Sequence, residues 1–189
     1  MTALSKVFAG WEGYQKSLVD AVAPLTRAQL LWRPADDRRS LGELARHISL
    51  GRITWFARMA APGMESAREQ VPEWGTDEDG ERDIVEDRVP ADDAGALVEW
   101  LTLSWHPIER VLEEWTVADL PVTYRHRWQG DTYAVSRQWT IWRIMAHDIH
   151  HGGQIAMLLG IRGIDAFALR ALGGHVVLPP LADAVREPR

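Results

Sequence analysis

The sequence contains no cysteine, and this absence narrows the chemistry that its side chains can supply. Without cysteine there can be neither a disulfide nor a thiolate ligand to a metal. A transition metal would therefore have to be held by imidazole and carboxylate groups, which directs attention to histidine, aspartate and glutamate.

Long apolar runs and an excess of positive charge are also missing. No stretch approaches the roughly 18 apolar residues of a membrane-spanning helix, and the first residues lack the basic and apolar pattern of an export signal. The net charge of −6 argues against nonspecific binding to nucleic acid, which requires a basic face. We therefore expect a cytoplasmic protein whose partners include neither membranes nor nucleic acids.

The length and the apolar periodicity predict the fold class. A chain of 189 residues fits a single domain over residues 1–189 with one core. Apolar side chains recur at three- and four-residue steps in four long segments, which predicts an all-α four-helix bundle. The expected long helices span about residues 3–23, 41–59, 90–115 and 136–160, with a short last helix at 165–172.

Other segments interrupt this helical pattern. Residues 122–135 are rich in β-forming residues around a Gln-Gly-Asp turn, which predicts a short β-hairpin before the last long helix. The polar, acidic stretch 62–87 is expected to be a surface loop. Pro107 predicts a kink or local unwinding in the third long helix.

Histidines carry the clearest chemical signal. His147 and His151 are four residues apart in the predicted last long helix, so both imidazoles share one face and can bind one metal ion. His47 lies in the middle of the second long helix and becomes a third ligand if the two helices face each other. The alternative is a hydrogen-bonded or surface histidine pair together with an interior histidine at position 47.

A family resemblance favours the metal site. His47 in the second helix, with His147 and His151 followed by Gly152-Gly153-Gln154-Ile155, resembles the pattern of the DinB/YfiT-like superfamily of proposed metalloenzymes. Gly152 departs from that motif, which often has arginine there. The resemblance implies a bacterial stress-associated four-helix bundle in which His47, His147 and His151 bind a divalent metal ion, with zinc or nickel expected and iron as an alternative.

The resemblance also limits the reactions to consider. It implies an enzyme that acts on a small molecule, first of all a transferase that uses a low-molecular-weight thiol such as mycothiol or bacillithiol in detoxification. The alternatives are a metal-dependent hydrolase and a noncatalytic metal- or ligand-binding stress protein. A homodimer is a further expectation.

Several residues near the predicted ligands are candidates for supporting roles. Glu43 is either a general base or the partner of Ser40 in a helix capping box. Arg143, one turn before His147, either holds an anionic substrate group or forms a surface or structural ion pair. Gln154 is expected to hydrogen-bond a ligand histidine or the substrate. Four aromatic residues are candidates to line a substrate pocket, whereas three histidines are assigned no role: the aromatic residues are Trp55, Trp128, Tyr133 and Trp139, and the histidines are His106, His126 and His175.

Overall fold

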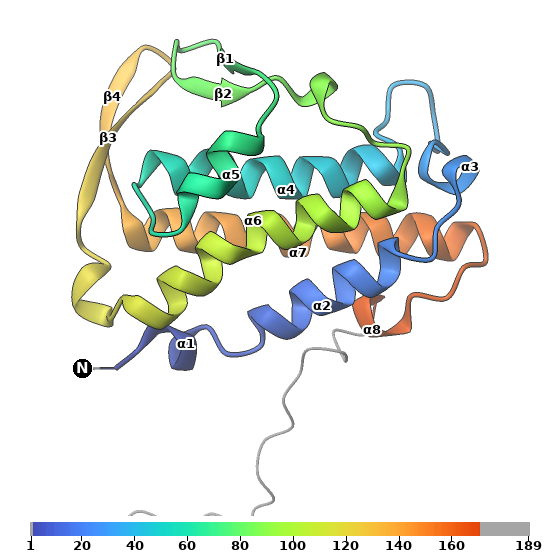
Figure 1. The fold of residues 1–189 in the computed structure, drawn as a ribbon, viewed down its shortest axis with the longest axis horizontal. Coiled ribbons are helices and arrows are strands. Elements are labelled where there is room, and N and C mark those ends of the chain that lie inside the picture. The colour runs from blue at the N-terminus through green and yellow to red at the C-terminus, as the bar shows by residue number, and fades with distance from the viewer. Residues whose placement is uncertain (1, 171–189) are drawn as a thin grey trace, which may run out of the picture.

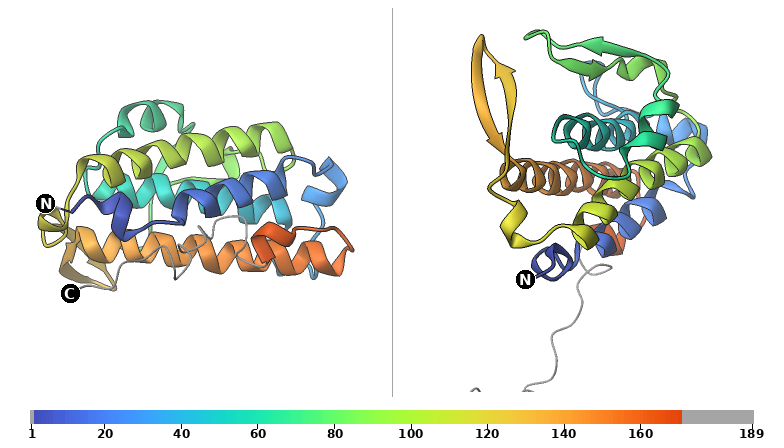
Figure 2. Two further views of the ribbon diagram at one scale, coloured as in Figure 1. Left: turned by 90° about the horizontal axis from the view of Figure 1, so that it is seen from below. Right: turned by 60° about the vertical axis from the view of Figure 1, so that its left-hand side comes forward.

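Four long helices form the main body of the protein, as a computed structural model that describes residues 2–170 shows (Figures 1 and 2). Helix α4 packs against both α6 and α7, and α2 packs against α6 and α7. The buried apolar side chains of these and the shorter elements form one cluster, which extends in the sequence from Leu4 to Leu169. The four helices are α2 (Trp11–Val22), α4 (Leu41–Arg58), α6 (Ala94–Glu114) and α7 (Arg137–Ile161).

Side-chain caps fix where three of these helices begin. The Ser40 hydroxyl accepts a hydrogen bond from the Glu43 N–H at the start of α4, and the Ser136 hydroxyl accepts one from the Trp139 N–H at the start of α7. Asp93 caps α6 in the same way through the Ala96 N–H. Such caps satisfy backbone donors that have no partner within the helix.

The first predicted helix is broken, so the prediction of one helix over residues 3–23 was wrong. A short helix, α1 (Leu4–Val7), is followed by α2 only after Gly10, whose φ of 100° lies in the left-handed region. Glycine adopts this conformation without steric penalty, and a right-handed helix cannot continue through it. Apolar periodicity alone does not detect such a break.

The segment predicted as a loop over residues 62–87 contains regular structure, which is a second correction. The antiparallel strands pair Trp74 with Ile84 and Thr76 with Arg82. Strands of only three residues are too short to show an alternating apolar pattern. The elements are α5 (Met64–Gln70), β1 (Trp74–Thr76), β2 (Arg82–Ile84) and the start of the 3-10 helix η1 (Glu86–Arg88).

The predicted hairpin before the last long helix is confirmed. Strands β3 (Thr123–Trp128) and β4 (Asp131–Ser136) are antiparallel, and Gln129 and Gly130 form the turn with positive φ angles. The Asp79 carboxylate, in the turn between β1 and β2, accepts hydrogen bonds from both turn N–H groups at 2.8 and 3.0 Å. The two hairpins therefore contact each other above α4 (Figure 1).

The remaining elements are short and lie at the ends of the long helices. Helix α6 continues through Pro107, so the local unwinding predicted there does not occur. Helix α8 lies within the predicted range 165–172, of which residues 171 and 172 are outside the described part of the chain. No helix over residues 2–170 has the length and apolarity needed to cross a bilayer. These elements are α3 (Arg27–Leu30), η2 (Val117–Asp119) and α8 (Phe167–Arg170).

Candidate metal centre

The three predicted metal ligands come together between α4 and α7. Each of His47, His147 and His151 offers a nitrogen, and these atoms all lie within 4.8 Å of one another. The Nε2 atoms of His47 and His147 are 3.0 Å apart, and the ring centroids of His147 and His151 are separated by 4.4 Å. Pairs along the helices show that α4 and α7 are antiparallel, because Trp55 contacts Trp139 whereas His47 contacts His151.

Hydrogen bonds to the second ring nitrogen orient two of the imidazoles. The Nδ1 atom of His47 is 2.6 Å from Oε1 of Glu86, and Nδ1 of His151 is 2.7 Å from Oε1 of Gln154. A carboxylate or amide oxygen only accepts, so each Nδ1 carries the hydrogen and each Nε2 presents a lone pair. This arrangement is typical of histidines that bind metals, and the expected hydrogen bond between Gln154 and a histidine of the cluster is present.

Glu86 was not found from the sequence, because it lies in the segment predicted to be a loop. The side chain of Arg46, on α4, holds the residues that follow Glu86. It donates hydrogen bonds to the Asp87 carboxylate and to the Val89 carbonyl, at 3.0 Å each. Burial alone would raise the pKa of Glu86, but the hydrogen bond from His47 and the nearby arginine charges lower it. The carboxylate is therefore an ionised acceptor for His47 at neutral pH.

His147 lies in the most enclosed position of the three. A β-carbon on Gly51 would come within 3.0 Å of its Cε1 atom, so the missing side chain of Gly51 makes room for this ring. Its Nδ1 atom is buried and has no hydrogen-bond partner among the described residues. Enclosure by α4 thus takes the place of the hydrogen bonds that orient the other two imidazoles.

Electrostatics keep the cluster in its ligating form. Burial, together with the charges that His151 and His47 carry when protonated, lowers the pKa of His147 to about 2. Burial also lowers the pKa of His151 to about 4, although its bond to Gln154 opposes the shift. Neutral imidazoles are the form that binds metals, so these two residues are ready to ligate at neutral pH.

This donor set fits a divalent transition metal. Three imidazoles converge, two of them with Nε2 lone pairs defined by their partners, and imidazole suits zinc, nickel, iron and copper. Within residues 2–170, no fourth histidine or carboxylate belongs to the cluster. Three protein ligands are typical of sites that keep a position open for an exogenous ligand.

A buried ion pair connects the helices around the cluster. Nε of Arg52 lies 3.1 and 3.0 Å from the two Asp148 carboxylate oxygens, and both side chains are completely buried. The Trp11 indole donates to the same carboxylate at 2.8 Å, and Gln15 accepts from Arg52 at 2.6 Å. Because α2, α4 and α7 all contribute, this network fixes the rotation of α7 that turns His147 and His151 towards α4.

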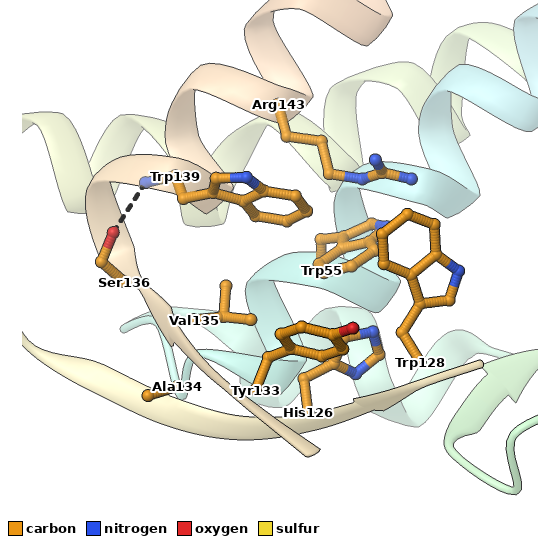
Figure 3. Close-up of a pocket in the computed structure, with 9 residues that line it drawn as sticks. All are labelled: Trp55, His126, Trp128, Tyr133, Ala134, Val135, Ser136, Trp139 and Arg143. Atoms are coloured by element: carbon orange, nitrogen blue, oxygen red, sulfur yellow. Dashed lines mark hydrogen bonds between the residues drawn. The ribbon is translucent and has the colours of Figure 1, made fainter. Parts of the chain in front are cut away.

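An aromatic cavity of about 330 Å³ is lined by residues of α4, α7 and the β3–β4 hairpin. The four aromatic residues expected to line a substrate pocket are all in its wall (Figure 3), and the binding of a substrate there stays a prediction. Arg143 also lines it, one helical turn before His147, and its charge contributes to the lowered pKa of His147. A second hollow of about 610 Å³ borders the cluster itself, because His151 lines it together with Arg38, Arg39 and Gln154 among others.

The other candidate residues have different positions. Glu43 completes the capping box, with one carboxylate oxygen 2.7 Å from the Ser40 nitrogen and the other 2.8 Å from Arg33. Its role as a general base stays a prediction. His126, to which no role was assigned, lies in the wall of the aromatic cavity, His106 is on α6 beside Glu109, and His175 is outside the described residues.

The fold and the site define a mostly helical protein with two small hairpins and a three-histidine cluster that is compatible with binding of a metal ion. A family model for the DinB superfamily matches residues 11–155, and the chain belongs to this superfamily.

One solved structure has a similar fold. It is a DinB-like protein from Bacillus cereus, which is 18% identical, with a TM-score of 0.55 over 82% of this chain and 90% of that chain. At this identity the likeness concerns the fold alone. No curated protein matches the chain.

Proposed function

We propose that this protein is a divalent-metal-dependent enzyme, and specifically a transferase that joins a low-molecular-weight thiol of the mycothiol or bacillithiol type to a small electrophile. The observation that supports this proposal most is the convergence of three imidazoles without a fourth ligand within residues 2–170. Such a set leaves room for an exogenous ligand next to a cavity. Detoxification or a stress response would be the setting for this activity.

The side chains of the site would have different roles in this reaction. His47, His147 and His151 would hold the ion, and zinc or nickel suits them. A divalent cation there would lower the pKa of a thiol cosubstrate, so that the thiolate is present at neutral pH. Glu86 and Gln154 keep two of the ligand rings in orientation through bonds of 2.6 and 2.7 Å.

Two hollows, one bordered by His151 and one by Arg143, would suit two substrates. The one lined by Arg38, Arg39 and Gln154 offers polar contacts to the hydrophilic part of a thiol. The aromatic cavity offers an apolar surface to the electrophile. Each would bring its ligand to the histidine cluster from one side.

A thiol reaction is favoured over hydrolysis by how the nearby carboxylates are used. Attack by water benefits from a general base, and a free carboxylate is a common choice. Both oxygens of Glu43 are engaged by Ser40 and Arg33, and Glu86 is engaged by His47. A thiol is acidic enough to ionise at such a site without a base from the protein.

Turnover assays with two arms test this proposal. Metal-loaded protein is incubated with panels of thiols and electrophiles, and the thioether product is measured by mass spectrometry. We expect product formation that His147→Ala abolishes and His106→Ala, at an exposed histidine on α6, leaves intact. A wild-type rate no higher than that of His147→Ala contradicts the proposal, and turnover of esters, amides or lactams without thiol would identify a hydrolase instead.

The remaining expectations stay predictions. They are the homodimer, the cytoplasmic location and the role of Arg143 in binding an anionic group. Size-exclusion chromatography with light scattering would test the first of them.

A further inference from the structure

The wall of the aromatic cavity contains two polar groups that lack an ion-pair or hydrogen-bond partner among residues 2–170. Arg143 has no carboxylate within ion-pair distance among residues 2–170, and its guanidinium stacks on Trp55 and Trp139 with 4.6 and 5.3 Å to the ring centroids. The neighbouring Arg58, in contrast, is paired with Asp77 at 2.9 Å. Arg143 is therefore a cation without a counter-ion at a cavity wall.

A second polar group in the cavity also lacks a partner. His126 is 7% exposed, and its Nδ1 atom is buried without a hydrogen bond to any described residue. Burial, with the charge of Arg58, lowers the pKa of His126, so the imidazole is neutral at pH 7. Buried polar atoms are normally satisfied by a hydrogen bond, so an unsatisfied nitrogen in a residue of the cavity wall indicates a missing partner, such as a ligand.

The walls between these two groups are aromatic and unusually exposed. Trp128, Tyr133 and Trp139 are 55%, 46% and 40% exposed, and their rings surround the same opening as Trp55 (Figure 3). Single exposed aromatic residues scattered over a surface are common and need no explanation. A contiguous group of them around a cavity, in contrast, indicates a binding site. Aromatic faces favour a flat, unsaturated ligand through offset or edge contacts.

The hairpin that carries part of this wall is held in place. The Glu81 carboxylate accepts a hydrogen bond from the Arg127 N–H at 2.8 Å, next to Trp128, and Asp79 binds the turn that follows. These bonds join the β3–β4 hairpin to the β1–β2 hairpin, which Arg58 of α4 in turn binds through Asp77 at 2.9 Å. The cavity is thus formed before a ligand arrives, which reduces the entropy lost on binding.

We infer that this cavity binds a planar aromatic carboxylate, with its ring among Trp55, Trp128, Tyr133 and Trp139 and its anionic group at Arg143. The volume of about 330 Å³ suits one or two fused rings, since it lies at the lower end of ligand pockets. A guanidinium binds a carboxylate through paired hydrogen bonds. Burial and the charge of Arg58 both lower the pKa of Arg143, and an anion bound there would stabilise the charged guanidinium. The inference rests on the proposed function only in one respect, which is that such a molecule, when it also carries an electrophilic carbon that the thiolate attacks, is the substrate.

Isothermal titration calorimetry with 2-naphthoate tests the inference, with 2-naphthamide as the uncharged counterpart. Titrations use the full chain both loaded with metal and treated with EDTA, because a carboxylate can also ligate a metal directly. We expect 2-naphthoate to bind both forms. The amide should bind with an affinity lower by about tenfold or more, as the loss of one charge-assisted contact predicts.

Two variants and two matched controls locate the site. Arg143→Gln and Trp128→Ala should each weaken 2-naphthoate binding by about tenfold or more. Arg127→Gln, on the same hairpin, and Trp142→Ala, on the same helix but outside the cavity, should bind like the wild type. Arg143→Gln should also remove the preference for the acid over the amide.

The inference is overturned if 2-naphthoate does not bind, if the amide binds equally well, or if both cavity variants bind like the wild type. Its failure can be told apart from failure of the proposed function. Thiol-dependent turnover without 2-naphthoate binding would remove only the present inference. Binding of 2-naphthoate as predicted, in a protein that retains no metal, would remove only the proposed function.

Discussion

Asp148→Asn should destabilise the protein strongly, because it leaves Arg52 charged and unpaired in the core. Asparagine keeps the shape of aspartate and an acceptor for the Trp11 indole, so the substitution removes mainly the charge. Both Arg52 and Asp148 are 0% exposed, and the guanidinium cannot turn towards water. Removing one partner of a buried ion pair costs about 3–5 kcal/mol.

That loss is large compared with the whole stability of a domain, which is about 5–15 kcal/mol. For a chain of this length, it corresponds to a fall in Tm of roughly 6–20 °C. Urea unfolding followed by circular dichroism would measure the free energy of unfolding of wild type and variant. Asp20→Asn is the matched control, because Asp20 is 57% exposed and its bond to Lys16 contributes about 1 kcal/mol at most.

The double variant Arg52→Met with Asp148→Leu separates pairing from packing. Replacing both charges by apolar groups of similar size is often nearly neutral, so this variant should be more stable than Asp148→Asn. A free energy of unfolding for Asp148→Asn within about 1 kcal/mol of the wild type would refute the reasoning, since surface substitutions reach that size.

Three further predictions concern the histidine cluster. Glu86→Gln should weaken metal affinity by about 10–100-fold in competition with a chelator while the Tm of the metal-free protein changes little; an unchanged affinity would mean that Glu86 does not orient His47. Gly51→Ala should lower metal affinity by displacing the His147 ring, although alanine favours the helix by up to about 1 kcal/mol; a metal affinity equal to that of the wild type would show that the ring has space to spare. In the metal-free protein, the folded-state pKa values of about 2 and about 4 for His147 and His151 lie below the ordinary value of 6.5, so the unfolded state binds more protons in acid. Stability from these residues is therefore complete above pH 6.5 and declines as the pH falls through about 4 and about 2; urea midpoints should show a smaller decline in His151→Ala, and an equal decline would contradict the assignment.

The histidine pair of α7 could be predicted because its information is local. His147 and His151 are one helical turn apart, and any helix places them on one face. The meeting of His47 with this pair depended on which helices face each other, which periodicity does not encode. The family resemblance supplied that step.

The network around Arg52 was not predictable from pattern. Arg52 and Asp148 are separated by 96 positions in the chain, and each is one charged residue among many. A charge in a helix usually marks a solvated face, since burial without a partner is costly. Here the partners come from other helices, so only the assembled fold shows that both charges are buried.

Glu86 and the first hairpin were missed for a related reason. The stretch 62–87 is acidic and has strands of only three residues, so it lacks the periodicity that identifies regular structure. Among its many carboxylates, only that of Glu86 bonds to a histidine of the cluster. The contact between Glu86 and His47 is supported by Arg46 of α4, which binds Asp87 and Val89, the residues that follow Glu86.

The most direct test of the metal centre is elemental analysis of the full chain, purified without a histidine tag, beside His47→Ala, His147→Ala and His151→Ala. Circular dichroism would confirm that each variant is folded, and His106→Ala is the matched control. A three-histidine centre predicts about one metal ion per chain in the wild type and the control, and loss of that ion in all three variants. A folded wild type that retains no metal even after reloading with zinc or nickel would contradict it.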